Sequence, residues 1–277
     1  MNIASSGTYD SAILGRTGIQ VGRLGISASY GVPGEALERA FERGVNYIYW
    51  GSRRTESFGA GIRRLRSQRD RFVLVIQSYT RVAGLMARSL ESALRALDLD
   101  HADVLLLGMW NKPVPARILD AARELQKRGR TRFLGVSTHT RSLVPHIASE
   151  RDFDVVHFRY NAAHPGAEKD IFPHLPIANR PGLVAFTATS WGSLLGQANL
   201  FIRIVKGAHP LPQGERAPTV ADCYRFVLTR PEVDVCLTGP ADATRMDQAL
   251  EALDRGPMSE EELAWMQRVG RAVAGKA

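Results

Sequence analysis

The segment SLESALRALDLDHADVLLL, residues 89–107, passes from a helical pattern into an apolar run typical of a strand. The same succession returns in ELQKRGRTRFLGVS, residues 124–137. Strand-like runs and helical patterns alternate in this way along nearly the whole chain. That alternation predicts a parallel sheet covered by helices.

Eight such units in about 250 residues match one closed (β/α)8 TIM barrel. We expect strands at residues 24–28, 45–49, 72–77, 104–108, 133–137, 155–158, 183–187 and 233–238. Helices are expected at residues 35–43, 56–65, 84–97, 114–128, 143–149, 168–175, 219–228 and 243–253. An N-terminal β-hairpin (11–25) precedes the barrel, and a C-terminal helix (259–269) with the capping-box pair Ser259 and Glu262 follows it.

No linker or change of composition divides the chain, so we expect residues 1–277 to form a single domain. Residues 198–217 are the loosest segment and are expected to be a loop long enough for a lid.

The composition narrows the classes of function. The 36 Lys and Arg exceed the 28 Asp and Glu, giving a net charge of +8, but they are scattered over amphipathic helices. We therefore expect no nucleic-acid partner. Cys223 and Cys236 lack metal-ligand spacing, and no other group of residues supports a metal. No apolar run could cross a bilayer and no signal peptide begins the chain, so we expect no membrane partner and a cytoplasmic location.

In barrels of this kind the chemistry sits where the strands end. The ends of the predicted strands and the loops after them are rich in aromatic and polar residues, which suggests a pocket for a sizeable organic molecule. We expect substrate contacts from Trp50, Arg53, Gln77, Trp110, Asn111, His139 and Trp191.

Several segments, in this order, resemble the aldo-keto reductase superfamily. They are LGRTGIQVGRLG (14–25), ALERAFERGVNYI (36–48), RDRFVLVIQ (69–77), the two segments quoted first, the pair Tyr160 and Asn161, and LTGPADATRMDQALEAL (237–253). The resemblance implies carbonyl reduction by NADPH. In the family an Asp, a Tyr, a Lys and a His perform it: Tyr gives a proton to the carbonyl oxygen, and the Asp-paired Lys makes that Tyr more acidic.

At the positions that the resemblance assigns to this tetrad, the chain carries other residues. Tyr49 stands for the Asp, Arg54 for the Tyr, Gln77 for the Lys and Gly108 for the His. An Arg is too basic to donate a proton near neutral pH. We therefore expect the tetrad chemistry to be absent in its usual form.

The resemblance also locates cofactor positions. Ser137 and Tyr160 match the family, whose Tyr stacks on the nicotinamide, and Arg245 is one remaining cation for the adenosine phosphate. His157 stands where the family has a Gln that contacts the nicotinamide amide. We therefore expect that no cofactor is required and that NADPH, if it binds, binds weakly.

Three functions follow. The first is non-redox proton transfer, such as isomerisation, elimination or cyclisation of an anionic or aromatic small molecule, carried by Tyr49, Arg54 and His157. The second is an NADPH-dependent carbonyl reductase with a non-standard acid, such as Tyr49. The third is a non-catalytic ligand-binding or regulatory barrel. The sequence leaves the substrate and the oligomeric state open.

Overall fold

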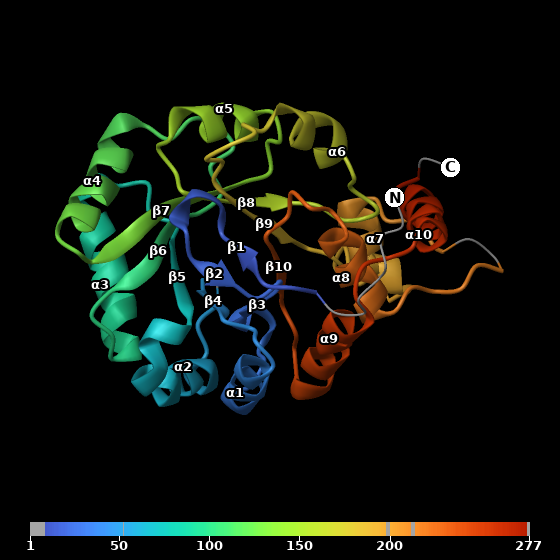
Figure 1. Cartoon of the computed structure of the whole chain (residues 1–277), viewed down its shortest axis with the longest axis horizontal. Helices are drawn as coiled ribbons and strands as arrows, with labels where there is room; N and C mark the ends of the chain where they lie inside the picture. Colours follow the sequence, from blue (N-terminus) through green and yellow to red (C-terminus); the bar gives the residue numbers. More distant parts are fainter. Residues whose placement is uncertain (1–8, 52, 198–199, 212–213, 276–277) are drawn as a thin grey trace.

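The structure is a computed structural model that describes residues 9–51, 53–197, 200–211 and 214–275. Its parallel strands close into a barrel in the order β10-β3-β4-β5-β6-β7-β8-β9 (Figure 1). They are β3 (Leu24–Ser27), β4 (Tyr47–Trp50), β5 (Val73–Ser78), β6 (Ala102–Leu107), β7 (Thr131–Thr138), β8 (Val155–Arg159), β9 (Gly182–Phe186) and β10 (Val235–Thr238). This architecture confirms the predicted barrel.

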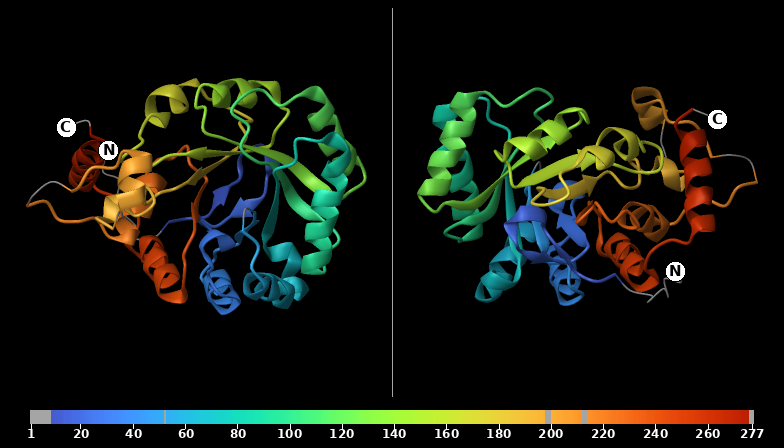
Figure 2. Two further views of the ribbon diagram at one scale, coloured as in Figure 1. Left: turned by 180° about the vertical axis from the view of Figure 1, so that it is seen from behind. Right: turned by 45° about the horizontal axis from the view of Figure 1, so that its top comes forward.

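Helices follow the strands around the outside of the barrel (Figure 2). They are α1 (Gly34–Glu42), α2 (Glu56–Arg64), α3 (Met86–Leu97), α4 (Ala116–Lys127), α5 (Leu143–Glu150), α6 (Ala167–Asp170), α7 (Leu200–Lys206), α8 (Val220–Leu228), α9 (Ala243–Arg255) and α10 (Glu260–Val273). The capping box of Ser259 and Glu262 opens α10 as expected.

Two expected segments differ from the structure. The helix expected over residues 168–175 is divided into α6 and a short 3-10 turn, Phe172–His174, because Pro173 has no backbone N–H to continue the helix. The segment expected as a loop over residues 198–217 contains α7, although 198–199 and 212–213 lie outside the described residues. No Gly or Pro interrupts the seven residues of α7, whereas Gly207 and Pro210 follow directly.

The strands bury two different faces, because successive side chains point to opposite sides of a strand. Tyr47, Tyr49, Val75 and Leu106 belong to the cluster inside the barrel. Alternate residues such as Ile48 pack outward in the larger cluster beneath the helices. This period of two decides which side chains at the strand ends can enter a pocket.

The N-terminal hairpin closes one end of the barrel. It is made of β1 (Ala12–Ile13) and β2 (Gln20–Val21), and Leu14 between them is fully buried in the inner cluster. The N–H of Arg16 donates to the carbonyl oxygen of Arg180 at 2.8 Å, just before β9 begins. The hairpin therefore covers this end of the barrel, and the strands finish at the opposite end.

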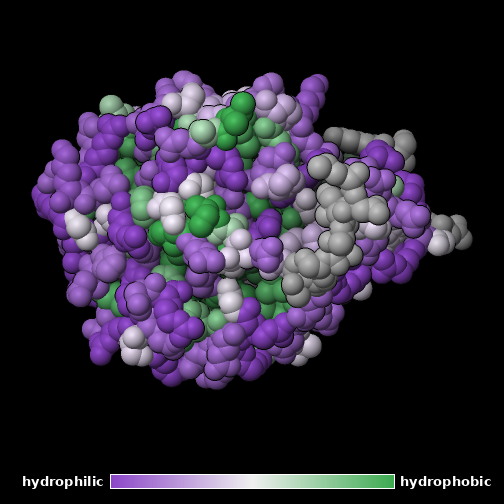
Figure 3. Space-filling model, viewed as in Figure 1, coloured by the Kyte–Doolittle hydropathy of each residue, from purple (hydrophilic) through white to green (hydrophobic). Residues whose placement is uncertain are grey.

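Hydrophilic residues dominate the face seen in Figure 3, and the hydrophobic ones form no continuous patch there. Among the described residues, no helix is both long and apolar enough to span a membrane.

Candidate active site

A cavity of about 560 Å³ opens at the carboxyl ends of the barrel strands. Barrels of this type place their chemistry at this end. Its lining includes residues from most strands and from the loops that follow them: Ser27, Tyr30, Tyr49, Gln77, Tyr79, Met109, Ser137, His157, Phe186, Thr187, Trp191, Tyr224, Leu237, Thr238, Gly239, Arg245 and Gln248.

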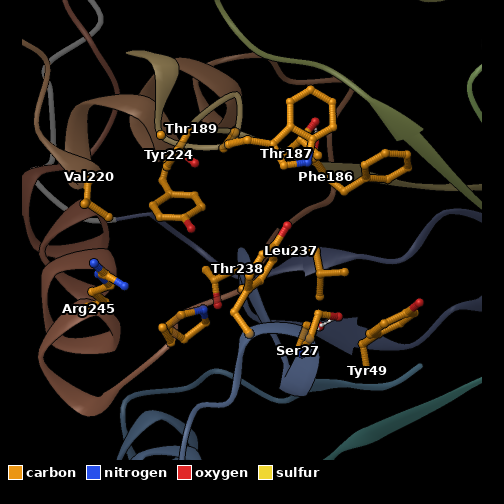
Figure 4. A pocket seen from close by; sticks show the side chains of 18 of the residues that line it. Ser27, Tyr49, Phe186, Thr187, Thr189, Val220, Tyr224, Leu237, Thr238 and Arg245 are labelled. Carbon is orange, nitrogen blue, oxygen red and sulfur yellow. Dashed lines mark hydrogen bonds between the residues drawn. The ribbon is translucent and has the colours of Figure 1, made fainter. Parts of the chain in front are cut away.

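The cavity has two chemically different ends (Figure 4). Tyr49 and Phe186 mark the end over the barrel, and Arg245 on α9 lies at the other end beside Tyr224 and Val220 of α8. No Asp or Glu is among the described residues that line the cavity, and Arg245 is the only Lys or Arg among them. The cavity therefore suits an elongated molecule with a flat ring at one end and an anionic group at the other.

Tyr49 points into the cavity from the end of β4, as the period of two predicts. Its side chain is 6% exposed, and its ring centroid lies 5.9 Å from that of His157. Gly51 makes room for this position: a Cβ built there would lie 1.9 Å from Cζ and 2.2 Å from Oη of Tyr49. The loop after β4 thus fixes where the phenol hydroxyl lies.

Arg54 lies in the same loop, but it is exposed and, against expectation, is not among the residues that line the cavity. Its Nη2 donates to the carbonyl oxygen of Gln77 at 2.8 Å, and its charge interacts with Tyr49 and Tyr79. Desolvation lowers the pKa of Arg54, but a guanidinium stays charged near neutral pH. The charge of Arg54 therefore acts on Tyr49, an interaction that no sequence pattern located. Arg53 is exposed and is absent from the lining.

Gln77 and Ser137 lie side by side in the wall. Gln77 Nε2 donates to Ser137 Oγ at 3.3 Å, and Ser137 Oγ also accepts from the backbone N–H of Met109 at 2.8 Å. A Cβ on Gly108 would lie 2.4 Å from Gln77 Nε2 and 2.8 Å from a ring carbon of Tyr79. The space next to Gly108 is therefore filled by Gln77 and Tyr79, which leaves no room for a larger residue there.

His157 is almost fully buried at the base of the cavity, on the inner face of β8. Its Nε2 lies 2.8 Å from the hydroxyl of Tyr47, which is also buried. Burial lowers the pKa of His157 to about 3, because a charged imidazolium is poorly solvated there. His157 is therefore neutral at physiological pH and acts only through hydrogen bonds.

This depressed pKa predicts a pH dependence of stability. The unfolded chain binds a proton at His157 below about pH 6.5, whereas the folded chain binds it only near pH 3. The contribution of His157 to the free energy of unfolding is therefore fully present above about pH 6.5, and it is lost as the pH falls toward 3. Between pH 7 and pH 5 the loss is about 2 kcal/mol. Urea unfolding of the wild type and His157→Gln should show this as a difference between the two proteins, since other titrating groups are shared.

Besides Arg53 and Arg54, five further residues expected at the site are not among those that line the cavity. Trp50 points outward and stacks on Phe58 of α2, because it is one position out of phase with Tyr49. The others are Trp110 beneath Arg81, Asn111, His139 with its ring 5.4 Å from Phe186, and Tyr160. Asn111 accepts the backbone N–H of His139 at 2.8 Å and so orders the loops around the cavity.

Tyr160 lies three positions after His157 and therefore on the other side of the β8 path. Its ring packs against Phe172 and Phe226, and its hydroxyl donates to Glu168 at 2.7 Å. It is fully buried among helices and does not reach the cavity, so it cannot stack on a group bound there. Trp191, Ser137 and Arg245 do line the cavity.

Residues that the sequence did not single out complete the site. Tyr30 and Tyr79 at the rim and Phe186 at the end of β9 all line the cavity, and Tyr47 supports His157 from below. The period of two could have identified Tyr47 and Phe186, since both share the inward phase of their strands. Tyr30 and Tyr79 depend on loop conformation, which that period does not describe.

A family model described as "Aldo/keto reductase family" matches residues 33–271. The chain belongs to the aldo/keto reductase family. Similar solved structures include aldo-keto reductase AKR11C1 from Bacillus halodurans in a holo form, with a TM-score of 0.71 and 16% sequence identity. The apo form gives 0.70 and 17%. Each match covers 95% of this chain and 96% of the other, and at such identity it shows the fold.

The expectation that no cofactor is required was wrong. Aldo-keto reductases normally use NADP(H), and one of the two similar structures is a holo form. The error came from counting lost cofactor positions one by one, which ignores the shape of the cavity. The cavity of this reductase-family chain fits a dinucleotide: it is elongated, its described lining has no carboxylate to repel phosphates, and Arg245 stands at the end away from the barrel.

Proposed function

We propose that the protein is an NADP(H)-dependent oxidoreductase that interconverts a carbonyl and an alcohol on a small aromatic molecule. In this proposal the usual tetrad is missing, and Tyr49 is the proton donor in its place. The observation that carries the proposal is the position of Tyr49, which lines the cavity at the end of β4. The charge of Arg54 acts on it from the loop outside the cavity lining. Bound NADP(H) supplies the hydride.

Tyr49 has the chemistry that carbonyl reduction requires. A phenol hydroxyl within hydrogen-bond distance of a carbonyl can give it a proton as the oxygen becomes negative. A neighbouring guanidinium stabilises the negative charge that then develops on the phenol oxygen. Arg54 thus takes the part that the resemblance gives to an ammonium group.

The cavity wall supports an aromatic substrate. Rings of Tyr49, Tyr79, Phe186 and Trp191 line it and offer flat apolar surface. Gln77 and Ser137 add uncharged polar groups nearby. We propose that substrates are aromatic aldehydes or ketones.

A substitution of Arg245 tests cofactor binding at the other end of the cavity. We propose that it pairs with the adenosine phosphate of NADPH. Arg245→Gln should raise the Kd for NADPH about 10-fold to 100-fold, because a charge-assisted hydrogen bond contributes about 1.5–3 kcal/mol. The Kd for NADH, which lacks that phosphate, and kcat at saturation should hardly change. Arg271→Gln, on the exposed side of α10, is the control for loss of one positive charge.

An assay of NADPH oxidation with a panel of aromatic carbonyl compounds tests the proposal as a whole. Oxidation of NADPH in equal amount with alcohol formation supports it. Conversion of a substrate while NADPH is left unchanged would instead support the non-redox proton transfer that the sequence suggested, since Tyr49 and Arg54 could also move a proton without a hydride. Ligand binding with no turnover would support a regulatory barrel.

A further inference from the structure

His157 is held between two tyrosine rings at the base of the cavity. The ring centroids of Tyr47 and Tyr49 each lie 5.9 Å from that of His157, tilted by 40° and 37°. Tyr47 Oη lies 2.8 Å from His157 Nε2. Tyr47 was not expected at the site, and the proposed reaction does not use it.

The direction of this hydrogen bond follows from burial. Tyr47 is fully buried, and His157 is the hydrogen-bond partner found for its hydroxyl among the described residues. A buried donor without an acceptor is more costly than an acceptor with a spare lone pair. The hydroxyl therefore donates, and Nε2 accepts. A neutral imidazole that accepts at Nε2 carries its proton on Nδ1.

The second ring nitrogen of His157, Nδ1, is available to a bound molecule. Nδ1 has no hydrogen-bond partner among the described residues, and it is not sealed from solvent. His157 itself lines the cavity. The protonated nitrogen is therefore the one that a bound molecule meets.

We propose that Tyr47 is a positioning residue that locks His157 as the Nδ1–H tautomer, so that the cavity always presents a neutral N–H donor to a carbonyl oxygen of the bound molecule. Only the identity of that carbonyl rests on the proposed function. Because the rings of Tyr49 and His157 are neighbours, two donors, one O–H and one N–H, can approach one substrate oxygen. Such paired donors stabilise the charge that develops on that oxygen.

The surroundings keep this donor unchanged with pH. The titratable groups nearest to the ring are Tyr47 and Tyr49 of β4, and Arg159 follows on the same face of β8. The partners in register on β7 and β9, Ser137 and Val184, do not titrate in the physiological range. Among the residues that the structure describes, no carboxylate is placed to stabilise an imidazolium, so a proton gained at Nε2 would have no anionic partner there.

Nitrogen-15 NMR of protein labelled in its histidines tests the tautomer directly, with His157→Gln used to assign the signals. The wild type should show a protonated Nδ1 and a pyridine-like Nε2 for His157 at pH 7, unchanged at pH 5. A protonated Nε2, or an imidazolium at pH 6, would overturn the proposal. This measurement needs no substrate and no cofactor, so it stands apart from the proposed reaction.

Tyr47→Phe tests the positioning role. The signals of His157 should move toward a mixture of tautomers, and KM for an aromatic carbonyl substrate should rise about tenfold. Tyr160→Phe removes another buried hydroxyl outside the cavity and should leave both readouts as in the wild type. A wild-type tautomer in folded Tyr47→Phe would overturn the proposal, and if that variant fails to fold, the wild-type spectrum still decides. The two failures can be told apart. A fully active Tyr49→Phe enzyme would contradict the proposed function, whereas a wild-type NMR spectrum without the Nδ1–H tautomer would contradict this inference.

Discussion

Tyr49→Phe should lower kcat for carbonyl reduction by about 100-fold to 10,000-fold, the usual contribution of a general acid. The substitution removes one oxygen from a side chain that faces the cavity and leaves its ring against His157. NADPH affinity and thermal stability should therefore stay close to the wild type. Stopped-flow absorbance of NADPH measures the rate.

The matched control for this prediction is Tyr160→Phe, which removes a tyrosine hydroxyl from a site outside the cavity. It should keep kcat within about twofold, although its stability should fall by about 1 kcal/mol because the hydrogen bond to Glu168 is lost. A Tyr49→Phe enzyme as fast as Tyr160→Phe would show that another group donates the proton.

Gly51→Ala should lower kcat by about 100-fold without unfolding the protein. The new methyl group would lie within 2.2 Å of the Tyr49 hydroxyl oxygen and must push the end of that ring aside. Displacement of a catalytic group by about 1 Å can cost about 100-fold in rate. The ring can turn toward the open cavity, so the free energy of unfolding should fall by only about 1–3 kcal/mol.

Gly84→Ala is the matched control, since a Cβ there meets no atom within 4 Å. It should change neither kcat nor the melting temperature appreciably. If Gly51→Ala kept wild-type activity, the position of Tyr49 set by the loop after β4 would not matter for the reaction. A crystal structure of Gly51→Ala would show whether the ring moves.

The barrel could be predicted because strand-like apolar runs and helical patterns alternate repeatedly along the chain. Every expected barrel strand is present, and the alternation of side chains correctly put Tyr49 inside. The same rule, applied to Trp50 one position later, places it outside against Phe58. Tyr160 was assigned from resemblance alone, and the parity of β8 shows why it cannot reach the cavity.

The rest depends on loops, which have no such period. The position of Arg54 results from the turn after β4 and from the hydrogen bond of its guanidinium to the carbonyl oxygen of Gln77 on the neighbouring strand. A sequence pattern predicts neither the turn nor this hydrogen bond, because both depend on the backbone conformation of the loop. For the same reason Tyr79 was not expected at the rim, and helix α7 was taken for a loop.

The central claim is that hydride passes from NADPH to a carbonyl carbon in the cavity described above. NADPH carrying deuterium at the transferred position, incubated with the protein and aromatic aldehydes or ketones, tests it most directly by mass spectrometry of the products. We expect one deuterium per molecule of alcohol formed, at the former carbonyl carbon. Product formed without deuterium would contradict it.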